Sequence, residues 1–260
     1  MKNYLAPNVT VNVSTEQFTF NFLNIEKSVY KGKEKLDKKI KKDRILKKCS
    51  CHRDYMNGDY SGVTKTFCAN YGLLYESLES CDNPYCVLRL DEMKKKSLQL
   101  QLEVFRTNNR GWGLKTRSRI MPLQYICEYV GELWLKDEYI NETEGWYCYE
   151  VEYNDITYVY DSEKEGNFAR MINHSCENNC VAISCCFRDD LIYKGNKIPQ
   201  VGIFAADKVI EPGEEICINY NKTYFTDNFV CLCEADTCIY KKKRRQNTFF
   251  KVKNHNKKTK

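Results

Sequence analysis

Residues 166–176 read Gly166-Asn-Phe-Ala-Arg-Met-Ile-Asn-His-Ser-Cys176, and a second cysteine cluster begins 55 residues later with Cys231, Cys233 and Cys238. Three thiolates on a short loop leave a tetrahedral zinc site one ligand short. We predict that Cys176 is the fourth ligand. A zinc ion shared between the two segments would hold the C-terminal loop against the Asn-His-Ser-Cys stretch. The spacing therefore predicts a pocket where the two segments meet.

The composition indicates a folded protein with metal-binding thiols. The 260 residues suffice for one large domain or two small ones, and a hydrophobic content of 42% can form a core. No apolar run approaches the ~18–20 residues that cross a bilayer, and the N-terminal residues lack the apolar stretch of a secretory signal. Fifteen cysteines in such a chain favour metal thiolates over disulfides. We expect a reducing compartment, cytosol or nucleus, and no membrane partner.

The net charge is +6, but basic and acidic residues are concentrated in different parts of the chain. Residues 241–260 carry ten Lys or Arg and no acid, and residues 27–48 carry eleven against three acids. The rest of the chain keeps 20 basic and 32 acidic residues, a balance near −12. Either basic run alone is typical of a solvated flank. Together with an acidic body, they also suit a protein that takes a basic peptide and touches nucleic acid. Lys241–Arg245 is in addition a candidate nuclear import signal.

Short apolar runs divided by turn residues predict a mostly β region between residues 102 and 220. The predicted strands are Leu102–Phe105, Gln124–Tyr129, Tyr147–Tyr153, Thr157–Tyr160, Val181–Phe187, Val201–Ala205 and Glu215–Tyr220. Pro212 and Gly213 supply a tight turn before the last of these. Trp134–Asn141 and Glu165–Ile172 are the predicted short helices.

The flanks have less regular patterns. Residues 1–26 alternate polar and apolar side chains and predict an edge strand or an extended arm. Residues 28–48 are predicted to be a helix or a linker, and residues 94–101 a polar connector. Residues 49–86 hold five cysteines with little periodicity, which is typical of a loop-rich metal module.

Three segments in order carry a family resemblance: Arg110-Gly-Trp-Gly-Leu-Lys115, Glu128-Tyr-Val-Gly-Glu132 and Gly166–Cys176. With Tyr220 and the cysteine loop after them, they resemble the SET-domain protein lysine methyltransferases with a post-SET zinc loop. The resemblance covers roughly residues 45–240. It implies a mostly β fold, the β-clip or SET fold, with pseudoknot-like threading of the Asn-His-Ser-Cys strand, few short helices and flanking zinc-binding loop modules.

The resemblance implies S-adenosyl-L-methionine as cofactor, held on one side of a channel that takes the substrate from the other. Glycines at 111 and 113 would bring backbone close enough to bond the ligand directly. Asn173 and His174 would receive the adenine through the main chain, and Leu232 would cover its ring. The implied cofactor residues are Arg110, Gly111, Trp112, Gly113, Trp146, Tyr147, Cys148, Arg170, Asn173, His174 and Leu232.

The implied reaction transfers the sulfonium methyl group to a lysine amine. The lysine ammonium, with a pKa near ~10.4, must first lose a proton. A narrow apolar channel and the nearby positive sulfonium both disfavour the charged amine. The enzyme then aligns nitrogen, carbon and sulfur. Tyr220 is the predicted catalytic hydroxyl, and Tyr129 would line the lysine channel. A core aromatic is the alternative for each, and remains an even alternative for Tyr129.

The upstream cysteines resemble the AWS-like module that precedes SET in the branch that methylates lysine 36 of histone H3. The family pattern has about seven cysteines on two zinc ions. Here Ser77 stands at one cysteine position and another ligand is missing, so we expect one zinc rather than two. The predicted metal ligands are Cys49, Cys51, Cys68, Cys81 and Cys86 in this module and Cys176, Cys231, Cys233 and Cys238 in the post-SET loop.

These observations predict five segments. They are an N-terminal arm and basic segment at 1–44, the AWS-like zinc module at 45–95, the SET domain at 100–223, the post-SET zinc loop at 227–242 and a basic tail at 243–260. The expected protein is a nuclear, chromosome-bound histone H3 methyltransferase. Lysine 36 leads and lysine 4 follows, with the H3 tail or nucleosome as partner and nucleosomal DNA against the basic arms.

Three departures from the family pattern keep an alternative open. Met171 replaces an aromatic residue, Asn219 stands where aspartate is common, and Ile218 occupies the position that tunes the number of methyl groups. The alternative is a catalytically silent SET module that binds chromatin through its zinc loops and basic ends. Tyr220, Arg170, Asn173 and a full post-SET cysteine set favour the enzyme.

Overall fold

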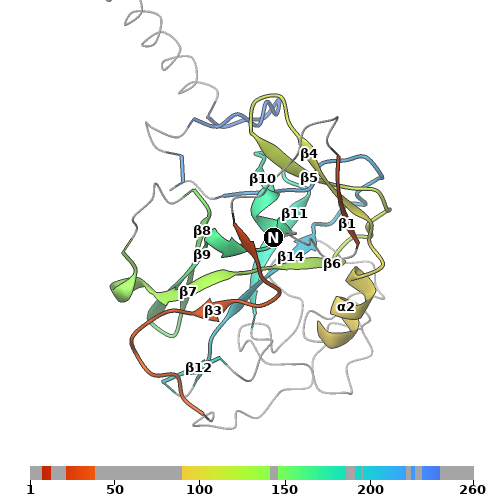
Figure 1. Ribbon diagram of the computed structural model, residues 1–260. Coiled ribbons are helices and arrows are strands. Elements are labelled where there is room, and N and C mark those ends of the chain that lie inside the picture. Colours follow the sequence, from red (N-terminus) through yellow and green to blue (C-terminus); the bar gives the residue numbers. More distant parts are fainter. Residues whose placement is uncertain are drawn as a thin grey trace, which may run out of the picture.

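The structure is a computed structural model that describes residues 8–12, 22–38, 90–140, 146–185, 191–194, 196–220, 224–225 and 230–240. The predicted AWS-like module, with Cys49, Cys51, Cys68, Cys81 and Cys86, and the predicted basic tail lie outside these residues. The described part is mostly β, as predicted (Figure 1). No helix within it is long and apolar enough to span a membrane.

The largest sheet is built around the long strand β9 (Ile156–Gly166). Its order is β2-β9-β7-β3, and β8 (Cys148–Tyr153) also pairs with β9 as an antiparallel hairpin. Strand β7 (Gly131–Leu135) runs antiparallel to β9, whereas β2 (Leu23–Asn24) and β3 (Val29–Tyr30) each add a short parallel partner. The N-terminal segment thus joins the sheet at two separate strands.

Two three-stranded sheets complete the framework. The first is antiparallel, in the order β11 (Cys180–Cys185), β14 (Gln200–Ala205) and β6 (Tyr125–Tyr129). The second places β4 (Leu102–Arg106) between β1 (Val9–Val11) and β5 (Trp112–Thr116). Strand β14 is buried along its whole length, so it lies at the centre of the core.

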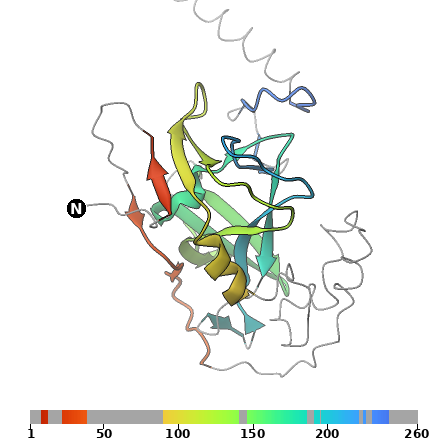
Figure 2. The same cartoon turned by 90° about the vertical axis from the view of Figure 1, so that its right-hand side faces the viewer.

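Short elements connect these sheets. Strands β12 (Ile192–Tyr193) and β13 (Asn196–Lys197) form a small hairpin, and β10 (Asn173–His174) pairs in parallel with β15 (Cys217–Ile218). The helical elements are α2 (Leu90–Ser97) and the 3-10 turns η2 (Lys136–Glu138) and η3 (Phe168–Met171). Figures 1 and 2 show α2 beside β6, against which it packs.

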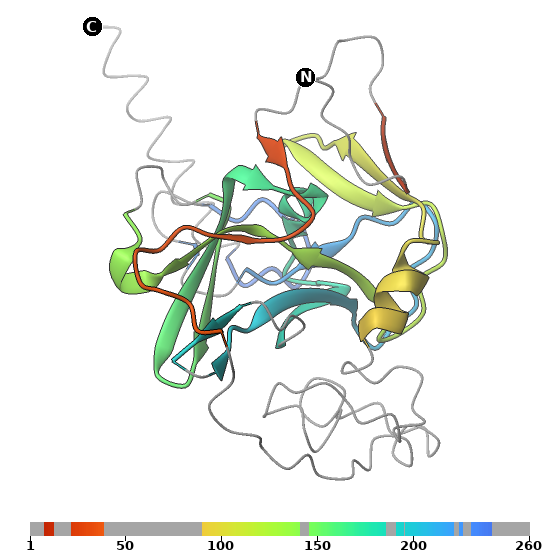
Figure 3. The same ribbon diagram turned by 60° about the horizontal axis from the view of Figure 1, so that its bottom comes forward.

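Residues 22–38 form an extended strap (Figure 3). Beyond β2 and β3, Ser28 Oγ accepts a hydrogen bond from the Gly131 amide at 3.3 Å, and Lys31 pairs with Glu165 and Glu132 at 2.9 and 3.4 Å. Glu138 accepts hydrogen bonds from the backbone N–H groups of Lys33 and Glu34. Of the two structures predicted for residues 28–48, the helix is therefore wrong for the described part, residues 28–38.

The predicted strands are confirmed within a few residues, and the predicted helices are largely wrong. The helix predicted at Trp134–Asn141 is wrong. This segment begins inside β7, whose side chains alternate between buried and half-buried with the period of a strand, and continues as the single turn η2. Glu165–Ile172 contains the end of β9 and the 3-10 turn η3. The predicted connector at 94–101 instead contains the last turn of α2. At the predicted turn, Gly213 has a positive φ of 97°.

Candidate functional site

The pairing of β10 with β15 brings two distant segments of the chain together. Asn173 lies opposite Cys217 and His174 opposite Ile218, and the Ser175 amide donates to the Ile218 carbonyl at 3.0 Å. The chain leaves β15 directly toward Tyr220. The rings of His174 and Tyr220 consequently lie 5.6 Å apart between centroids. The Asn-His-Ser-Cys stretch and the predicted catalytic tyrosine therefore belong to one site.

The hydrogen bonds of His174 determine its tautomer. The backbone N–H of Tyr220 donates to Nδ1 at 3.1 Å, and Nε2 lies 3.3 Å from the Cys176 Sγ. Burial, followed by the charge of Arg110, lowers the pKa of His174 to about 4, so the ring is neutral at pH 7. Because Nδ1 accepts, the single ring proton sits on Nε2. Nε2–H therefore donates to the Cys176 sulfur.

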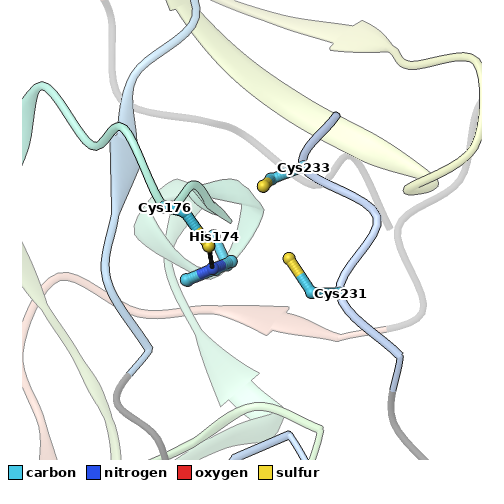
Figure 4. A group of neighbouring side chains, drawn as sticks. All are labelled: His174, Cys176, Cys231 and Cys233. Carbon is cyan, nitrogen blue, oxygen red and sulfur yellow. Dashed lines mark hydrogen bonds between the residues drawn. The ribbon is translucent and has the colours of Figure 1, made fainter. Parts of the chain in front are cut away.

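All four predicted cysteines of the C-terminal site come together. Donor atoms of His174, Cys176, Cys231 and Cys233 lie within 4.8 Å of one another (Figure 4). The Cys238 sulfur lies 3.7 Å from that of Cys176 and 3.8 Å from that of Cys231. Zinc–sulfur bonds of ~2.3 Å in a tetrahedron place the sulfurs ~3.8 Å apart. The donor set and its spacing fit a zinc ion.

Cys238 suits this site better than His174 does. A histidine binds a metal through an unprotonated ring nitrogen. The Nδ1 lone pair of His174 is occupied by the Tyr220 amide, and Nε2 carries the proton. The ring thus fits the role of a hydrogen-bond donor to one ligand, the outer-shell arrangement that orients ligands in metal sites. The fit favours four thiolates with His174 beside them.

Contacts outside the cluster also fasten the cysteine loop. Glu177 accepts hydrogen bonds from the amide and hydroxyl of Thr237 at 3.0 and 2.8 Å, and Asn109 donates to Glu234 at 2.7 Å. Phe225 stacks between His174 and Tyr240, at centroid distances of 4.5 and 4.6 Å. These contacts dock residues 230–240 on the β10 region independently of a metal ion.

Arg110 and Asn173, both predicted cofactor residues, share one carboxylate. Arg110 Nη2 donates to Glu215 Oε2 at 2.6 Å, and Asn173 Nδ2 donates to Glu215 Oε1 and to the Trp112 carbonyl, each at 2.9 Å. Gly113 is required here, since a Cβ at this position would lie 2.8 Å from Glu215 Oε1. Glu215 thus connects the turn at residues 110–113 with strand β10 through hydrogen bonds.

Sequence reasoning did not assign a role to Glu215. Its signal was a carboxylate two residues after the Pro212-Gly213 turn, at the start of the strand that leads to Tyr220. The side chain of Arg110 is committed to this carboxylate and to the His174 carbonyl at 3.3 Å. Attraction to Glu215 keeps the pKa of Arg110 above its usual value, although burial, the largest influence, acts to lower it.

Arg170 lies between two aromatic rings. Its guanidinium carbon is 3.8 Å from the ring centroid of Tyr147 and 4.2 Å from that of Phe22. Burial lowers the pKa of Arg170, and its Nε has no hydrogen-bond partner. Among the described residues it forms no ion pair of 4.0 Å or less. Glu163 and Asp161 attract the guanidinium without forming an ion pair with it, so this partly buried side chain is suited to bind an anionic ligand group.

Of the two predicted site tyrosines, Tyr129 is buried and Tyr220 is partly buried, and both make short hydrogen bonds to the main chain. Tyr220 Oη donates to the Ile172 carbonyl at 2.5 Å, and Tyr129 Oη donates to the Tyr147 carbonyl at 2.6 Å. Burial is the main cause that raises the pKa of both phenols far above the usual value of 10.0. Both therefore stay neutral hydroxyl groups at physiological pH.

The remaining predicted cofactor residues are more dispersed. Trp146 and Leu232 are 53% and 39% exposed. The Cys148 sulfur lies 2.9 Å from the Tyr139 hydroxyl, which donates to Asp161 at 2.7 Å. Gly111 has a positive φ of 72°, and a Cβ there would have no neighbour within 4 Å. In the turn at residues 111–113, neighbouring side chains thus lie close to the backbone of Gly113, whereas the space beside Gly111 is empty.

The geometry described above coincides with a match to a known family. Residues 111–221 match the family model for the SET domain. This region of the chain is similar to SET domains. Strands β5 to β15, with Arg170, Asn173, His174, Glu215 and Tyr220, all lie inside it, whereas the strap and most of the cysteine loop lie outside.

The chain is also similar to two named proteins, one SET domain-containing protein and one histone-lysine methyltransferase. The variant-silencing SET domain-containing protein of Plasmodium falciparum is 32% identical over 203 residues, 70% of this chain and 8% of that protein. The histone-lysine N-methyltransferase, H3 lysine-9 specific SUVH5 of Arabidopsis thaliana is 32% identical over 154 residues, 57% of this chain and 18% of that protein. The chain thus spans less than a fifth of either relative.

A solved structure supports the same SET fold. Arabidopsis thaliana SUVH6 in complex with S-adenosylmethionine superimposes with a TM-score of 0.59 at 26% identity, over 89% of this chain and 52% of that one. The coverage exceeds the SET domain alone. The arrangement of sheets around β9 and β14 is accordingly that of the SET fold.

Proposed function

We propose that this protein is an S-adenosyl-L-methionine-dependent protein-lysine N-methyltransferase that acts on histone H3. The supporting observation is the β10–β15 pairing, which sets Tyr220 beside the Asn173-His174 stretch inside a SET domain. The name of the relative SUVH5 specifies histone-lysine methyl transfer, and SUVH6 was solved with S-adenosylmethionine.

The site has features that fit this cofactor. Arg170 offers a half-buried guanidinium to the methionine carboxylate, and Tyr147 flanks it. The backbone at Gly111–Gly113 would hold the methionine portion, and that of Asn173 and His174 the adenine. When bound, the cofactor supplies a methyl group activated by a positive sulfonium. Trp146, Cys148 and Leu232 remain proposed contacts at the edge of the pocket.

The proposed role of the chain is to position a neutral amine. Desolvation in a narrow channel favours loss of the proton from the substrate lysine. The Tyr220 hydroxyl, which donates its proton to the Ile172 carbonyl, would accept a hydrogen bond at the transfer point without becoming a phenolate. Tyr129, held by the Tyr147 carbonyl, would line the lysine channel. Alignment of the reacting atoms supplies most of the rate.

Zinc is the second proposed cofactor. Cys176, Cys231, Cys233 and Cys238 would hold one ion in the post-SET position, because the Cys238 sulfur lies at tetrahedral spacing from two of the others and those of Cys176, Cys231 and Cys233 lie within 4.8 Å of one another. A second ion in the AWS-like module stays a prediction from the cysteine pattern. The C-terminal ion would keep the loop with Leu232 against the cofactor pocket.

Two observations point to different target lysines. The relative SUVH5 is named for lysine 9 of histone H3, and the cysteine spacing at 49–86 resembles the lysine-36 branch. We therefore propose lysine 9 first and lysine 36 second, in place of the predicted order of lysine 36 and lysine 4. An acidic body would meet the basic histone tail. We also propose that the basic arms contact nucleosomal DNA. The proposed location is the nucleus, on the chromosome.

Methyl transfer to recombinant nucleosomes tests the function and the target together. Mass spectrometry of the H3 peptides after incubation with S-adenosylmethionine and zinc is expected to show methyl groups on lysine 9 or lysine 36. Tyr220→Phe is expected to lower transfer at least tenfold. Tyr193→Phe, which removes a phenol from the distant strand β12, is the matched control and is expected to retain activity.

The same experiment separates the enzyme from the silent SET module. A wild-type protein that binds nucleosomes but transfers no methyl group would contradict the proposed activity and favour a binding role. Equal activity of wild type and Tyr220→Phe would contradict the role of the hydroxyl. Methylation confined to lysine 4 would overturn the proposed target.

A further inference from the structure

The strap of residues 22–38 fixes the position of Phe22 beside the SET domain. Leu23 pairs with Glu165 and Asn24 with Gly166, and the Ile25 amide donates to the Gly166 carbonyl at 2.8 Å. These bonds set the register of the strap against the end of β9. Phe22, which precedes β2, is 5% exposed and is therefore held in the interior.

Phe22 and Tyr147 both contact the guanidinium of Arg170. The guanidinium carbon lies 4.2 Å from the Phe22 centroid and 3.8 Å from the Tyr147 centroid. Two rings at these distances restrict the orientations that the planar guanidinium can take. The N–H groups of a guanidinium held in this way recognise a carboxylate in a planar arrangement. Aromatic faces also stabilise a buried cation through its attraction to the ring electrons.

We propose that Phe22, which lies outside the residues matched by the SET family model, is a positioning residue for S-adenosylmethionine binding. It holds the Arg170 guanidinium in the orientation that receives the methionine carboxylate of the cofactor. This inference rests on the proposed function. The N-terminal strap thus contributes to the cofactor pocket, and a chain that lacked it would keep the SET motifs and bind the cofactor weakly.

The inference predicts a ligand-dependent effect. Phe22 acts on the carboxylate end of the cofactor only, through Arg170. Loss of the aromatic ring is expected to weaken binding of S-adenosylhomocysteine, which has that carboxylate, by about fivefold, the effect of losing a cation–π contact at the lower end of its range. Binding of 5′-methylthioadenosine, which lacks the amino-acid portion, is expected to stay within twofold of wild type.

Isothermal titration calorimetry of the full chain tests this with both ligands and three variants. Phe22→Leu removes the ring and keeps apolar bulk. Phe22→Tyr keeps the ring and is expected to retain wild-type affinity for both ligands. Leu23→Ala, at the next residue of the strap with a side chain 52% exposed, is the matched control and is expected to leave both affinities unchanged.

A double-mutant cycle with Arg170→Lys separates positioning from packing. Once the guanidinium is replaced, Phe22→Leu is expected to cause little further loss of S-adenosylhomocysteine affinity. Equal weakening of both ligands by Phe22→Leu, or none at all, would overturn the inference and leave the methyltransferase proposal standing. If the wild type binds neither ligand, the proposed function itself fails, and the inference with it.

Discussion

The backbone N–H of Tyr220 donates a hydrogen bond to Nδ1 of His174 at 3.1 Å, although 46 residues separate the two in the chain. The same imidazole faces the Cys176 sulfur with its other nitrogen. One neutral ring therefore joins the cysteine cluster to the main chain of the predicted catalytic tyrosine. A metal ion in that cluster would be coupled to the position of Tyr220 by direct contacts.

Two substitutions at His174 are expected to separate its two hydrogen bonds. His174→Asn places an amide near the position of Nδ1 and loses the contact with Cys176. We expect it to lower zinc affinity about tenfold, the usual effect of losing an outer-shell partner. His174→Gln extends an amide toward Cys176 and is expected to keep zinc but lower kcat, because Tyr220 loses its anchor.

Competition with a chromophoric chelator measures the zinc affinity, and steady-state methyl transfer measures kcat. Parallel losses of both properties in the two variants would contradict separate roles for Nδ1 and Nε2. An increase of zinc affinity in His174→Asn would contradict the hydrogen bond to Cys176.

Loss of a single sulfur ligand is expected to open the cofactor pocket. Cys233→Ser leaves three thiolates, so zinc content should fall, and the loop with Leu232 should be held only by its remaining contacts, such as Glu177 with Thr237. S-adenosylhomocysteine should then bind at least fivefold more weakly. Metal analysis and calorimetry check both effects, with Cys127→Ala, a buried cysteine of strand β6 outside the cluster, as the control for thiol loss. Unchanged ligand affinity in zinc-free Cys233→Ser would count against the loop as a pocket wall.

Glu215→Gln is expected to destabilise the fold more than the loss of an exposed acid. It leaves Arg110, whose side chain is 20% exposed, without its partner, at a cost of about 1–3 kcal/mol in the free energy of unfolding. Glu211→Gln breaks the exposed pair with Arg119, with side chains 51% and 63% exposed, and should cost clearly less because both charges stay in water. Urea denaturation of both variants provides the comparison, and equal costs would contradict a structural role for Glu215.

Acid is expected to weaken the fold through Glu103. Burial alone would raise the pKa of this carboxyl, but hydrogen bonds from Lys115, Asn12 and Arg117 outweigh it and lower the pKa below 4.5. Below pH 4.5 the unfolded chain takes up a proton at this residue before the folded chain does, so stability is lost as pH falls. Glu103→Gln should remove the share of the stability loss between pH 6 and pH 3 that comes from protonation of this carboxylate. The same decline in wild type and variant, measured by urea denaturation at each pH, would contradict it.

Local sequence patterns predicted β4, β6, β8, β9, β11, β14 and β15, because short apolar runs carry their own signal. Strands β4, β6 and β14 appear within one residue of the predicted bounds. The pattern failed where tertiary context decides. Mixed charges at 134–141 suggested a helix, yet antiparallel pairing with β9 gives residues 131–135 the alternation of a strand. The strap is extended because two partner strands hold it, and its own charged sequence does not reveal them.

The candidate site was predictable where a motif or a spacing carries it. The cysteine spacing and the known tetrahedral preference of zinc sufficed to group Cys176 with the C-terminal loop. Glu215 and Phe22 were missed because their roles depend on partners far away in the chain. Glu215 meets Arg110 across 105 residues, and Phe22 reaches Arg170 only through the strap. No local pattern around either residue specifies such a contact.

The most direct test of the central proposal is mass spectrometry of histone H3 from recombinant nucleosomes incubated with the zinc-loaded chain and S-adenosylmethionine. We predict methyl groups on lysine 9 or lysine 36, formed by the wild-type chain and strongly reduced for Tyr220→Phe. Unmodified H3 from a folded, zinc-loaded wild-type chain would contradict the assignment as a histone methyltransferase.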